Sequence, residues 1–197
     1  MSEIALLLSD KVYNPSDDSY ILTKTISDID NCLSIALELG SGSGYVSIYR
    51  MKKCRKSYTI MVDISPCSVR SSWESAKING IDDLVDVIQC DAGACIRSMS
   101  IDTIYFNPPY LPVEEFNDIL SISWSGGIDG ITVWSKFFNE SYRICRDNCK
   151  IIFIVSSLQD IGKIIDIISS MCNEIEFYMC KEFFFETICS VITRCKK

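Results

Sequence analysis

The stretch LELGSGSGYVS, residues 37–47, joins an apolar run to a turn with three glycines and then to a helical pattern. The apolar run from Leu33 to Leu39 predicts a buried strand, and a helix is expected from about Ser43 to Met51. A strand, a glycine turn and a helix in this order are typical of a nucleotide-type site at the first crossover of an open α/β sheet. The spacing is GxGxG with no lysine after it, so neither a dinucleotide fingerprint nor a phosphate-binding P-loop is matched.

Acidic side chains lie at or just after the ends of three successive predicted strands. Glu38 precedes Gly40 by two residues, which points to a cationic ligand over Gly40 and Gly42. The amino group and sulfonium of a methionine-derived cofactor carry such a charge. Asp63, about 20 residues further on, can accept from both ribose hydroxyls of an adenosine. Asp91 can accept from an adenine amino group, although a single strand-end acid is often only a cap.

A second motif, Asn107-Pro108-Pro109-Tyr110, follows the apolar run from Ile101 to Phe106, which predicts another buried strand. Two prolines cannot continue a central strand, so the backbone stops where open α/β sheets bind their ligands. The Asn107 carboxamide oxygen and the Pro108 carbonyl can each accept one hydrogen bond from a planar NH2 group, and the Tyr110 ring can stack on it. This arrangement suits an amide or an exocyclic amine. The alternative is a strand-ending turn without chemistry.

Elsewhere the chain alternates between strand and helix patterns, which predicts an α/β fold with a mostly parallel sheet. A loop over residues 111–130 is too long for a simple connector and favours a functional segment or a lid. The further expected strands are 57–62, 84–89, 150–156, 175–180 and 183–193, and the further helices are 67–79, 131–145, 158–171 and one that begins near Ser16 or Asp17.

Composition excludes several classes of protein. A net charge of −7 and a pI of about 4.7 argue against charge-driven binding to nucleic acid. The basic stretch Lys52-Lys53-Cys54-Arg55-Lys56 is interpreted as a solvated helix end. The mean hydropathy is +0.18, yet no apolar run approaches the length of a transmembrane helix. The N-terminus lacks the features of a signal peptide, so a cytoplasmic protein is expected.

Eleven cysteines are scattered along the chain without a CxxC pair, and there is no histidine. A structural zinc site is therefore not expected, and no metal ligands are predicted. Cysteine catalysis would lack its usual histidine base. The odd number of cysteines in apolar surroundings predicts reduced thiols packed as small hydrophobic residues.

These residues carry a family resemblance. The chain resembles class I S-adenosylmethionine-dependent methyltransferases over nearly its whole length, and within them the eukaryotic and archaeal release-factor glutamine methyltransferases. Two departures are the aspartate at position 17, where the family more often has glutamate, and a short loop between Pro112 and Trp124. The matching stretches are VYNPSDDSYIL (12–22), LELGSGSGYVS (37–47), VDIS (62–65), FNPPYLP (106–112), WSGGIDG (124–130) and ETICSVI (186–192).

The resemblance implies a single domain over residues 1–197, with a seven-stranded, mostly parallel Rossmann-like sheet and helices on both faces. It implies S-adenosylmethionine as cofactor, S-adenosylhomocysteine as product, and methyl transfer to the glutamine of a Gly-Gly-Gln motif in a class I release factor. The residues it assigns to the cofactor are Tyr13, Asp18, Ser19, Glu38, Gly40, Gly42, Asp63, Asp91 and Asn107. Those it assigns to the substrate are Asn107, Pro108, Pro109 and Tyr110, with Asn107, Pro108 and Tyr110 expected to be catalytic.

The resemblance also implies partners. A small zinc-binding activator subunit is expected to cover the edge strand near Leu84–Ile88, and the release factor is expected as substrate, alone or with its partner GTPase. No membrane and no direct nucleic-acid contact are expected. The alternative activities are methylation of adenine N6 in DNA or RNA and of protein lysine. A non-enzymatic alternative is an inactive cofactor-binding scaffold.

Overall fold

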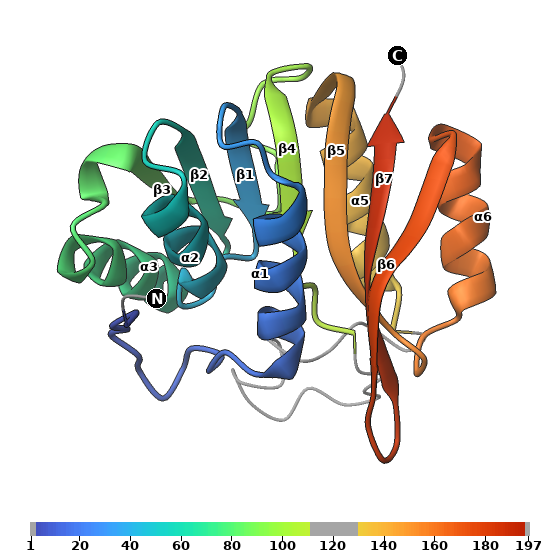
Figure 1. Ribbon diagram of the computed structural model, residues 1–197, viewed down its shortest axis with the longest axis horizontal. Coiled ribbons are helices and arrows are strands. Elements are labelled where there is room, and N and C mark those ends of the chain that lie inside the picture. The colour runs from blue at the N-terminus through green and yellow to red at the C-terminus, as the bar shows by residue number, and fades with distance from the viewer. Residues whose placement is uncertain (1–2, 111–129, 196–197) are drawn as a thin grey trace.

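The computed structural model describes residues 3–110 and 130–195, in which seven strands form one sheet in the order β3-β2-β1-β4-β5-β7-β6 (Figure 1). The strands are β1 (Ile35–Leu39), β2 (Tyr58–Asp63), β3 (Val85–Gln89), β4 (Ile101–Phe106), β5 (Cys145–Ser156), β6 (Glu174–Glu182) and β7 (Thr187–Cys195). The described helices are α1 (Asp17–Ile29), α2 (Tyr45–Lys53), α3 (Pro66–Ile78), α5 (Thr132–Ile144) and α6 (Ile161–Met171), with a 3-10 turn at Asp82–Leu84.

Strands β3, β2, β1, β4 and β5 pair in parallel, and β7 runs antiparallel between β5 and β6. The carboxyl ends of β1, β2 and β4 therefore meet at one edge of the sheet. Helices cover both faces, because alternate residues of each strand point to opposite sides. Ala36 packs with the α1 residues Ile21 and Leu22, whereas Leu37 packs with Trp134 of α5. The predicted fold class is confirmed, and the single domain over 1–197 stays a prediction.

The last hairpin differs from its prediction. Residues 183–193 were expected to form one strand because phenylalanine favours β structure. Instead β7 begins at Thr187, and the Phe183 N–H donates to the Glu186 carbonyl at 2.7 Å to close the turn. The strand expected at 150–156 is also longer, beginning at Cys145. The starts of β7 and β5 are set by the pairing of β5, β7 and β6, and local β propensity does not predict them.

The surface agrees with the interpretation of the basic stretch at the end of α2. Helix α2 ends at Lys53, and Arg55 and Lys56 after it are exposed, as expected for a solvated helix end. None of the helices in residues 3–110 and 130–195 combines the length and the apolarity needed to span a bilayer.

The prediction that all cysteines are reduced thiols is wrong. Six of the eleven cysteines form disulfides in the structure, joining Cys32 to Cys54, Cys145 to Cys149 and Cys180 to Cys189. Spacings of 22, 4 and 9 residues do not reveal these pairs in the sequence. The fold does, because the register of β6 on β7 places Cys180 directly opposite Cys189.

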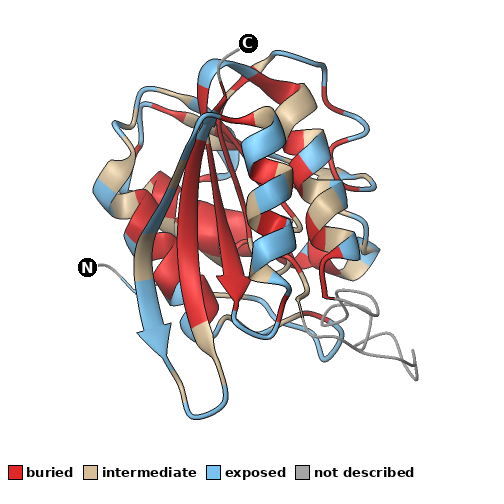
Figure 2. Cartoon of the chain, turned by 90° about the vertical axis from the view of Figure 1, so that its right-hand side faces the viewer, coloured by how far each residue is buried: buried red, intermediate tan, exposed pale blue. Residues whose placement is uncertain are grey.

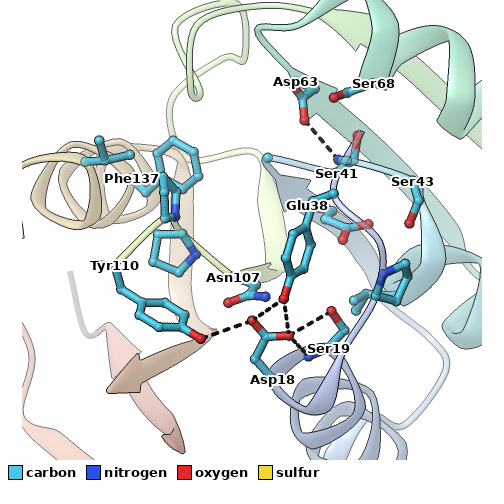
Figure 3. Close-up of a pocket in the computed structure, with 18 of the residues that line it drawn as sticks. Asp18, Ser19, Glu38, Ser41, Ser43, Asp63, Ser68, Asn107, Tyr110 and Phe137 are labelled. Carbon is cyan, nitrogen blue, oxygen red and sulfur yellow. Dashed lines mark hydrogen bonds between the residues drawn. The ribbon is translucent and has the colours of Figure 1, made fainter. Parts of the chain in front are cut away.

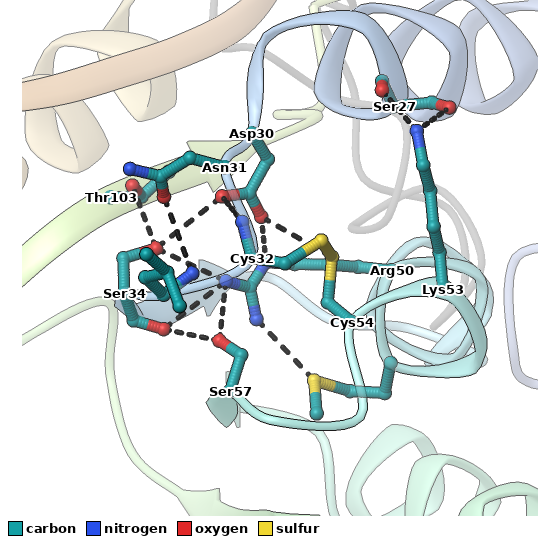
Figure 4. Close-up of a disulfide and its surroundings, with 12 residues drawn as sticks. Ser27, Asp30, Asn31, Cys32, Ser34, Arg50, Lys53, Cys54, Ser57 and Thr103 are labelled. Carbon is teal, nitrogen blue, oxygen red and sulfur yellow. Dashed lines mark hydrogen bonds and ion pairs between the residues drawn. A yellow bond between two sulfur atoms is a disulfide. The ribbon is translucent and has the colours of Figure 1, made fainter.

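A buried ion pair anchors the amino edge of the sheet (Figure 4). The fully buried guanidinium of Arg50 lies 2.6 Å from Asp30, just after α1. It also donates to Thr59 Oγ1 at 2.8 Å, to Ser57 Oγ at 2.7 Å and to the Ser34 carbonyl at 3.2 Å. One side chain of α2 therefore ties together the segments that enter β1 and β2, beside the disulfide that joins the same two regions.

Replacing Asp30 by alanine leaves this guanidinium buried without its counter-charge. We expect Asp30→Ala to lower the free energy of unfolding by about 3–5 kcal/mol. The exposed pair of Lys24 and Asp28 offers a matched control, since Lys24→Ala removes an ion pair worth about 0.3–0.5 kcal/mol. Urea unfolding of both variants measures the difference. An equal decrease in the free energy of unfolding in both variants would mean that the buried pair does not anchor the sheet.

Candidate active site

A cavity of about 800 Å³ opens at the carboxyl edge of the sheet (Figure 3). It brings together every residue that the sequence assigned to a site, from the N-terminal segment and from the ends of β1, β2, β3 and β4. These residues are Tyr13, Asp18, Ser19, Glu38, Gly40, Gly42, Asp63, Asp91, Asn107, Pro108, Pro109 and Tyr110. The structure shows that these residues line one cavity, and the role of each residue stays a prediction.

The glycine turn lies under this cavity. The Gly40 and Ser41 N–H groups both donate to the Val62 carbonyl, at 2.8 and 3.0 Å, which holds the turn against β2. Gly40 has φ +70°, and a Cβ there would lie 3.0 Å from the ring of Phe137, so a side chain would be strained and crowded. At Gly42 a Cβ would meet nothing within 4 Å. The backbone at Gly42 is thus open to close approach by a ligand.

Glu38, at the end of β1, is a buried carboxyl group. It accepts hydrogen bonds from the Ser47 N–H at 3.2 Å and from the Ser47 hydroxyl, which is itself 2.8 Å from the Tyr105 hydroxyl. Burial raises the pKa of Glu38 to about 8, and the nearby charge of Asp63 raises it further against the effect of Ser47. A cationic group beside it would favour the ionised form. The structure thus fits the cationic ligand predicted from the sequence.

Asp63, at the end of β2, holds the glycine turn from the other side. Its two carboxylate oxygens accept from the Gly42 N–H at 2.9 Å and from the Ser65 N–H at 2.8 Å. Burial raises its pKa, and the hydrogen bonds from Ser65 and Gly42 oppose that rise. Each oxygen keeps a lone pair that could accept from a ribose hydroxyl.

Asp91 lies in a different environment, at the exposed rim of the cavity. Its carboxylate is 2.5 Å from Lys136 Nζ, a residue of α5, and about half of each side chain is exposed. The predicted adenine contact would share the carboxylate with this lysine. Sequence reasoning did not foresee Lys136, because on a helix an exposed lysine usually means only a solvated face.

One carboxylate connects the N-terminal segment to the NPPY motif. Asp18 accepts from the Tyr13 hydroxyl at 3.0 and 3.1 Å, from the Ser19 N–H at 2.5 Å and from the Tyr110 hydroxyl at 3.3 Å. Ser16, near which this helix was expected to begin, occupies the N-cap position of α1 but directs its hydroxyl to Asp18 at 3.0 Å. Burial, followed by the charge of Asp18, raises the pKa of both tyrosines, which therefore remain donors.

Asn107 presents the most informative atom of the site. Its Oδ1 is buried and, among the residues that the structure describes, has no hydrogen-bond donor. A buried carbonyl-type oxygen without a partner is unfavourable and rare. In Figure 3 its carboxamide points toward the group formed by Asp18 and Tyr110. A ligand with an NH2 group would supply the missing donor.

Several cavity residues were not predicted. Phe137 forms a wall beside Gly40, and Phe183, Glu186 and Ile188 contribute from the last hairpin. Phe137 was predicted only as part of the apolar face of a helix, since helical periodicity does not show which residue of that face lines a cavity. The stretch ETICSVI was matched to the family, but no role was attached to Glu186.

The WSGGIDG segment and the loop expected at 111–130 lie outside the described residues, except for Gly130. Gly130 has φ +69°, and a Cβ there would lie 2.7 Å from the Tyr110 carbonyl oxygen. Its own carbonyl accepts from Gln159 Nε2 at 2.7 Å. A glycine two residues before α5 therefore lets the backbone there lie close to the Tyr110 carbonyl.

The strand order and the glycine turn at the end of β1 define a Rossmann-like fold, and a family match identifies the class of protein as a methyltransferase. The chain matches the family described as Methyltransferase small domain over residues 17–122. It belongs to this family.

Known proteins confirm the narrower resemblance predicted from the motifs. A protein of Methanocaldococcus jannaschii, whose provisional name is protein N5-glutamine methyltransferase, is 35% identical over 140 residues, covering 70% of this chain and 68% of that protein. Human methyltransferase HEMK2 is 30% identical over 135 residues, covering 64% of this chain and 63% of HEMK2. This chain therefore matches only about two thirds of the length of each of these relatives.

A solved structure shares the fold. The E. cuniculi Mtq2–Trm112 complex, described as responsible for methylation of the eRF1 translation termination factor, matches with a TM-score of 0.71. The match covers 95% of this chain and 99% of the other at 18% identity. At this identity the likeness concerns the fold alone.

The raised pKa of Glu38 makes a prediction about ligand binding. If the ammonium group of a ligand binds the Glu38 carboxylate, this carboxyl group has to lose its proton, because it is mostly protonated below pH 8 in the free protein. Affinity for S-adenosylmethionine should therefore rise by about tenfold or more between pH 6 and pH 8, as one proton is released on binding. Calorimetry in buffers of different ionisation enthalpy measures both quantities. Glu38→Gln should abolish the proton release. A wild-type affinity without pH dependence would place the ammonium away from Glu38.

Proposed function

We propose that this protein transfers a methyl group from S-adenosylmethionine to the side-chain amide nitrogen of a glutamine, in the Gly-Gly-Gln motif of a class I release factor. The buried Oδ1 of Asn107 at the wall of the cavity carries this proposal, because it has no donor among the described residues and a primary amide offers an NH2 group. Support also comes from the names of the relatives, which describe glutamine methyltransferases. Release factors act in translation, so we propose a cytoplasmic location.

The cofactor half of the cavity fits the proposed ligand. When bound, S-adenosylmethionine supplies a sulfonium whose methyl group is open to attack by a nucleophile. Glu38 would hold its ammonium group, the open backbone at Gly42 would admit its methionine part, and Asp63 would accept from its ribose. Asp91 would reach the adenine at the rim. Tyr13, Asp18 and Ser19 close the end of the cavity beside the NPPY motif.

The acceptor half would orient the nucleophile. An amide nitrogen attacks poorly because its lone pair is delocalised into the carbonyl. Asn107 Oδ1 and the Pro108 carbonyl would each accept one N–H, which orients the nitrogen and stabilises the positive charge that develops on it. Tyr110 would pack beside the amide, and its hydroxyl bond to Asp18 fixes the position of the ring. Positioning of this kind contributes about 7–11 kcal/mol in favourable cases.

Removing the Asn107 carboxamide should separate binding from transfer. Asn107→Ala is expected to abolish methyl transfer, a loss of at least about 100-fold, while S-adenosylmethionine binding stays within a few fold. Tritiated-methyl transfer and calorimetry measure the two quantities, and exposed Asn139→Ala is the matched control. Loss of both binding and transfer would mean that Asn107 mainly supports the cofactor pocket.

The choice of substrate needs its own experiment. Tritiated methyl groups are offered to the release factor, alone and with its partner GTPase, to lysine-containing proteins and to adenine-containing DNA and RNA. We expect label on the Gly-Gly-Gln glutamine, located by mass spectrometry. Label on adenine or lysine would favour the alternative activities. Cofactor binding without any transfer would favour the scaffold.

We further propose that a small activator subunit binds the free edge of β3. Among the described strands β3 pairs only with β2, so one side of its backbone is open, and such an edge is a liability when uncovered. Apolar side chains lie around it. Trp73 and Val87 are half-buried at a shallow hollow beside the strand, and Ile64 and Ile78 are 59% and 52% exposed. The Mtq2–Trm112 complex supports a partner of this kind.

The edge proposal predicts a specific loss of assembly. Trp73→Ala should weaken binding of the activator by at least about tenfold, since buried aromatic residues dominate such contacts. Leu33→Ala, at a residue 77% exposed at the amino edge of the sheet, is the control and should bind as the wild type does. Co-purification and calorimetry measure the effect. A chain that is soluble and fully active alone would count against the activator.

A further inference from the structure

The turn of the last hairpin exposes two large aromatic side chains. It connects β6 to β7 through the sequence Glu182-Phe183-Phe184-Phe185-Glu186. Phe184 is 93% exposed and Phe185 84%, and their rings pack edge to face, with centroids 4.6 Å apart. Figure 1 shows the hairpin extending beyond the carboxyl edge of the sheet, and Figure 2 shows its exposed tip. Contiguous exposed apolar patches are often interaction sites, whereas single exposed apolar residues are common and need no explanation.

The exposed tip is continuous with the acceptor end of the cavity. Phe183, Glu186 and Ile188 of this hairpin line the same cavity as Asn107 and Tyr110. Because β7 runs antiparallel to β5, the start of β7 lies at the carboxyl edge, where Ile188 pairs with Ser156. A molecule whose amide reaches Asn107 from outside would therefore pass close to the hairpin.

Polar contacts hold the hairpin in place against the site. Lys181 Nζ lies 2.6 Å from an Asp17 oxygen and 4.8 Å from the centre of the Phe183 ring. The Ser156 hydroxyl donates to Glu186 Oε2 at 2.6 Å. Asp17 begins α1, whose next residue binds the Tyr110 hydroxyl. The tip is therefore presented at a defined position relative to the NPPY motif.

We infer that Phe184 and Phe185 form the docking surface for the protein that carries the acceptor glutamine, an inference that rests on the proposed function. Neither ring lines the cavity, so a free amide or a short peptide could fill the site without contacting them. Glu182 and Glu186 flank the pair, which fits an apolar patch with basic residues beside it on the partner. An anionic membrane is a poorer fit, because these carboxylates and a net charge of −7 would be repelled by its surface.

The test compares two substrates of one enzyme. Phe184→Ser/Phe185→Ser is assayed with its activator on the intact release factor and on a peptide of about ten residues around its Gly-Gly-Gln motif. We expect kcat/KM for the intact factor to fall at least about tenfold, mainly through KM, since hot-spot aromatics of an interface are lost. Turnover of the peptide and cofactor binding should change less than twofold.

Three controls make the outcome decisive. Leu33→Ser, another exposed apolar residue at the opposite edge, should leave both substrates unaffected. Phe184→Leu/Phe185→Leu should retain most of the activity on the intact factor. Sedimentation with phosphatidylserine vesicles tests the membrane, and vesicle binding that depends on the two rings, with unchanged turnover of the intact factor, would overturn the inference.

The results also separate this inference from the function it rests on. If the wild type methylates both substrates and the double variant treats them alike, the docking surface is refuted while the proposed function stands. If the wild type methylates neither substrate, the proposed function fails first, and the docking surface fails with it.

Discussion

The parallel pairing of β1 with both β2 and β4 is the constraint on which the rest of the structure depends. It aligns Leu39 with Val62 on one side and with Phe106 on the other. Residues that follow these strands then have to meet, although they lie up to 70 positions apart in the chain. The glycine turn, Asp63 and the NPPY motif share one cavity for this reason. Every later step of the proposed chemistry uses that alignment.

Two polar side chains of the cavity, Glu38 and Asn107, would gain favourable contacts from a bound ligand. Burial raises the pKa of Glu38 to about 8, and a cationic group beside it would favour its charged form. Burial also raises the pKa of Asp63, while hydrogen bonds from Ser65 and Gly42 oppose that rise. Asn107 Oδ1 lacks a donor among the described residues. A ligand that carries a cationic group and an NH2 donor would therefore bind favourably to these side chains. By contrast Arg50, buried at the opposite edge, is fully partnered and supports the framework.

Much of this could be predicted from the sequence, because short-range rules govern it. Glycines mark positive φ, as at Gly40, prolines end β4 after Phe106, and the alternation of patterns predicts a parallel sheet. Contacts between distant segments could not be predicted. Asp18 and Tyr110 are 92 residues apart, and no sequence pattern near either residue predicts their hydrogen bond. The disulfides were not predicted because they too join segments that are distant in the sequence or set by strand pairing. The hairpin turn was not predicted because a run of phenylalanines has high β propensity.

The amino-acid sequence is enough to predict the class of fold, the ends of the central strands and the residue types at the site, since these follow from periodicity, backbone restrictions and local chemistry. Which side chains face one another depends on how the whole chain packs. In the packed chain the Tyr110 hydroxyl donates to Asp18, Lys136 forms an ion pair with Asp91, and the Phe184–Phe185 tip lies beside the acceptor end of the cavity. The physical reason is that burial and long-range pairing are properties of the packed chain, and they select one partner from many that local preference allows.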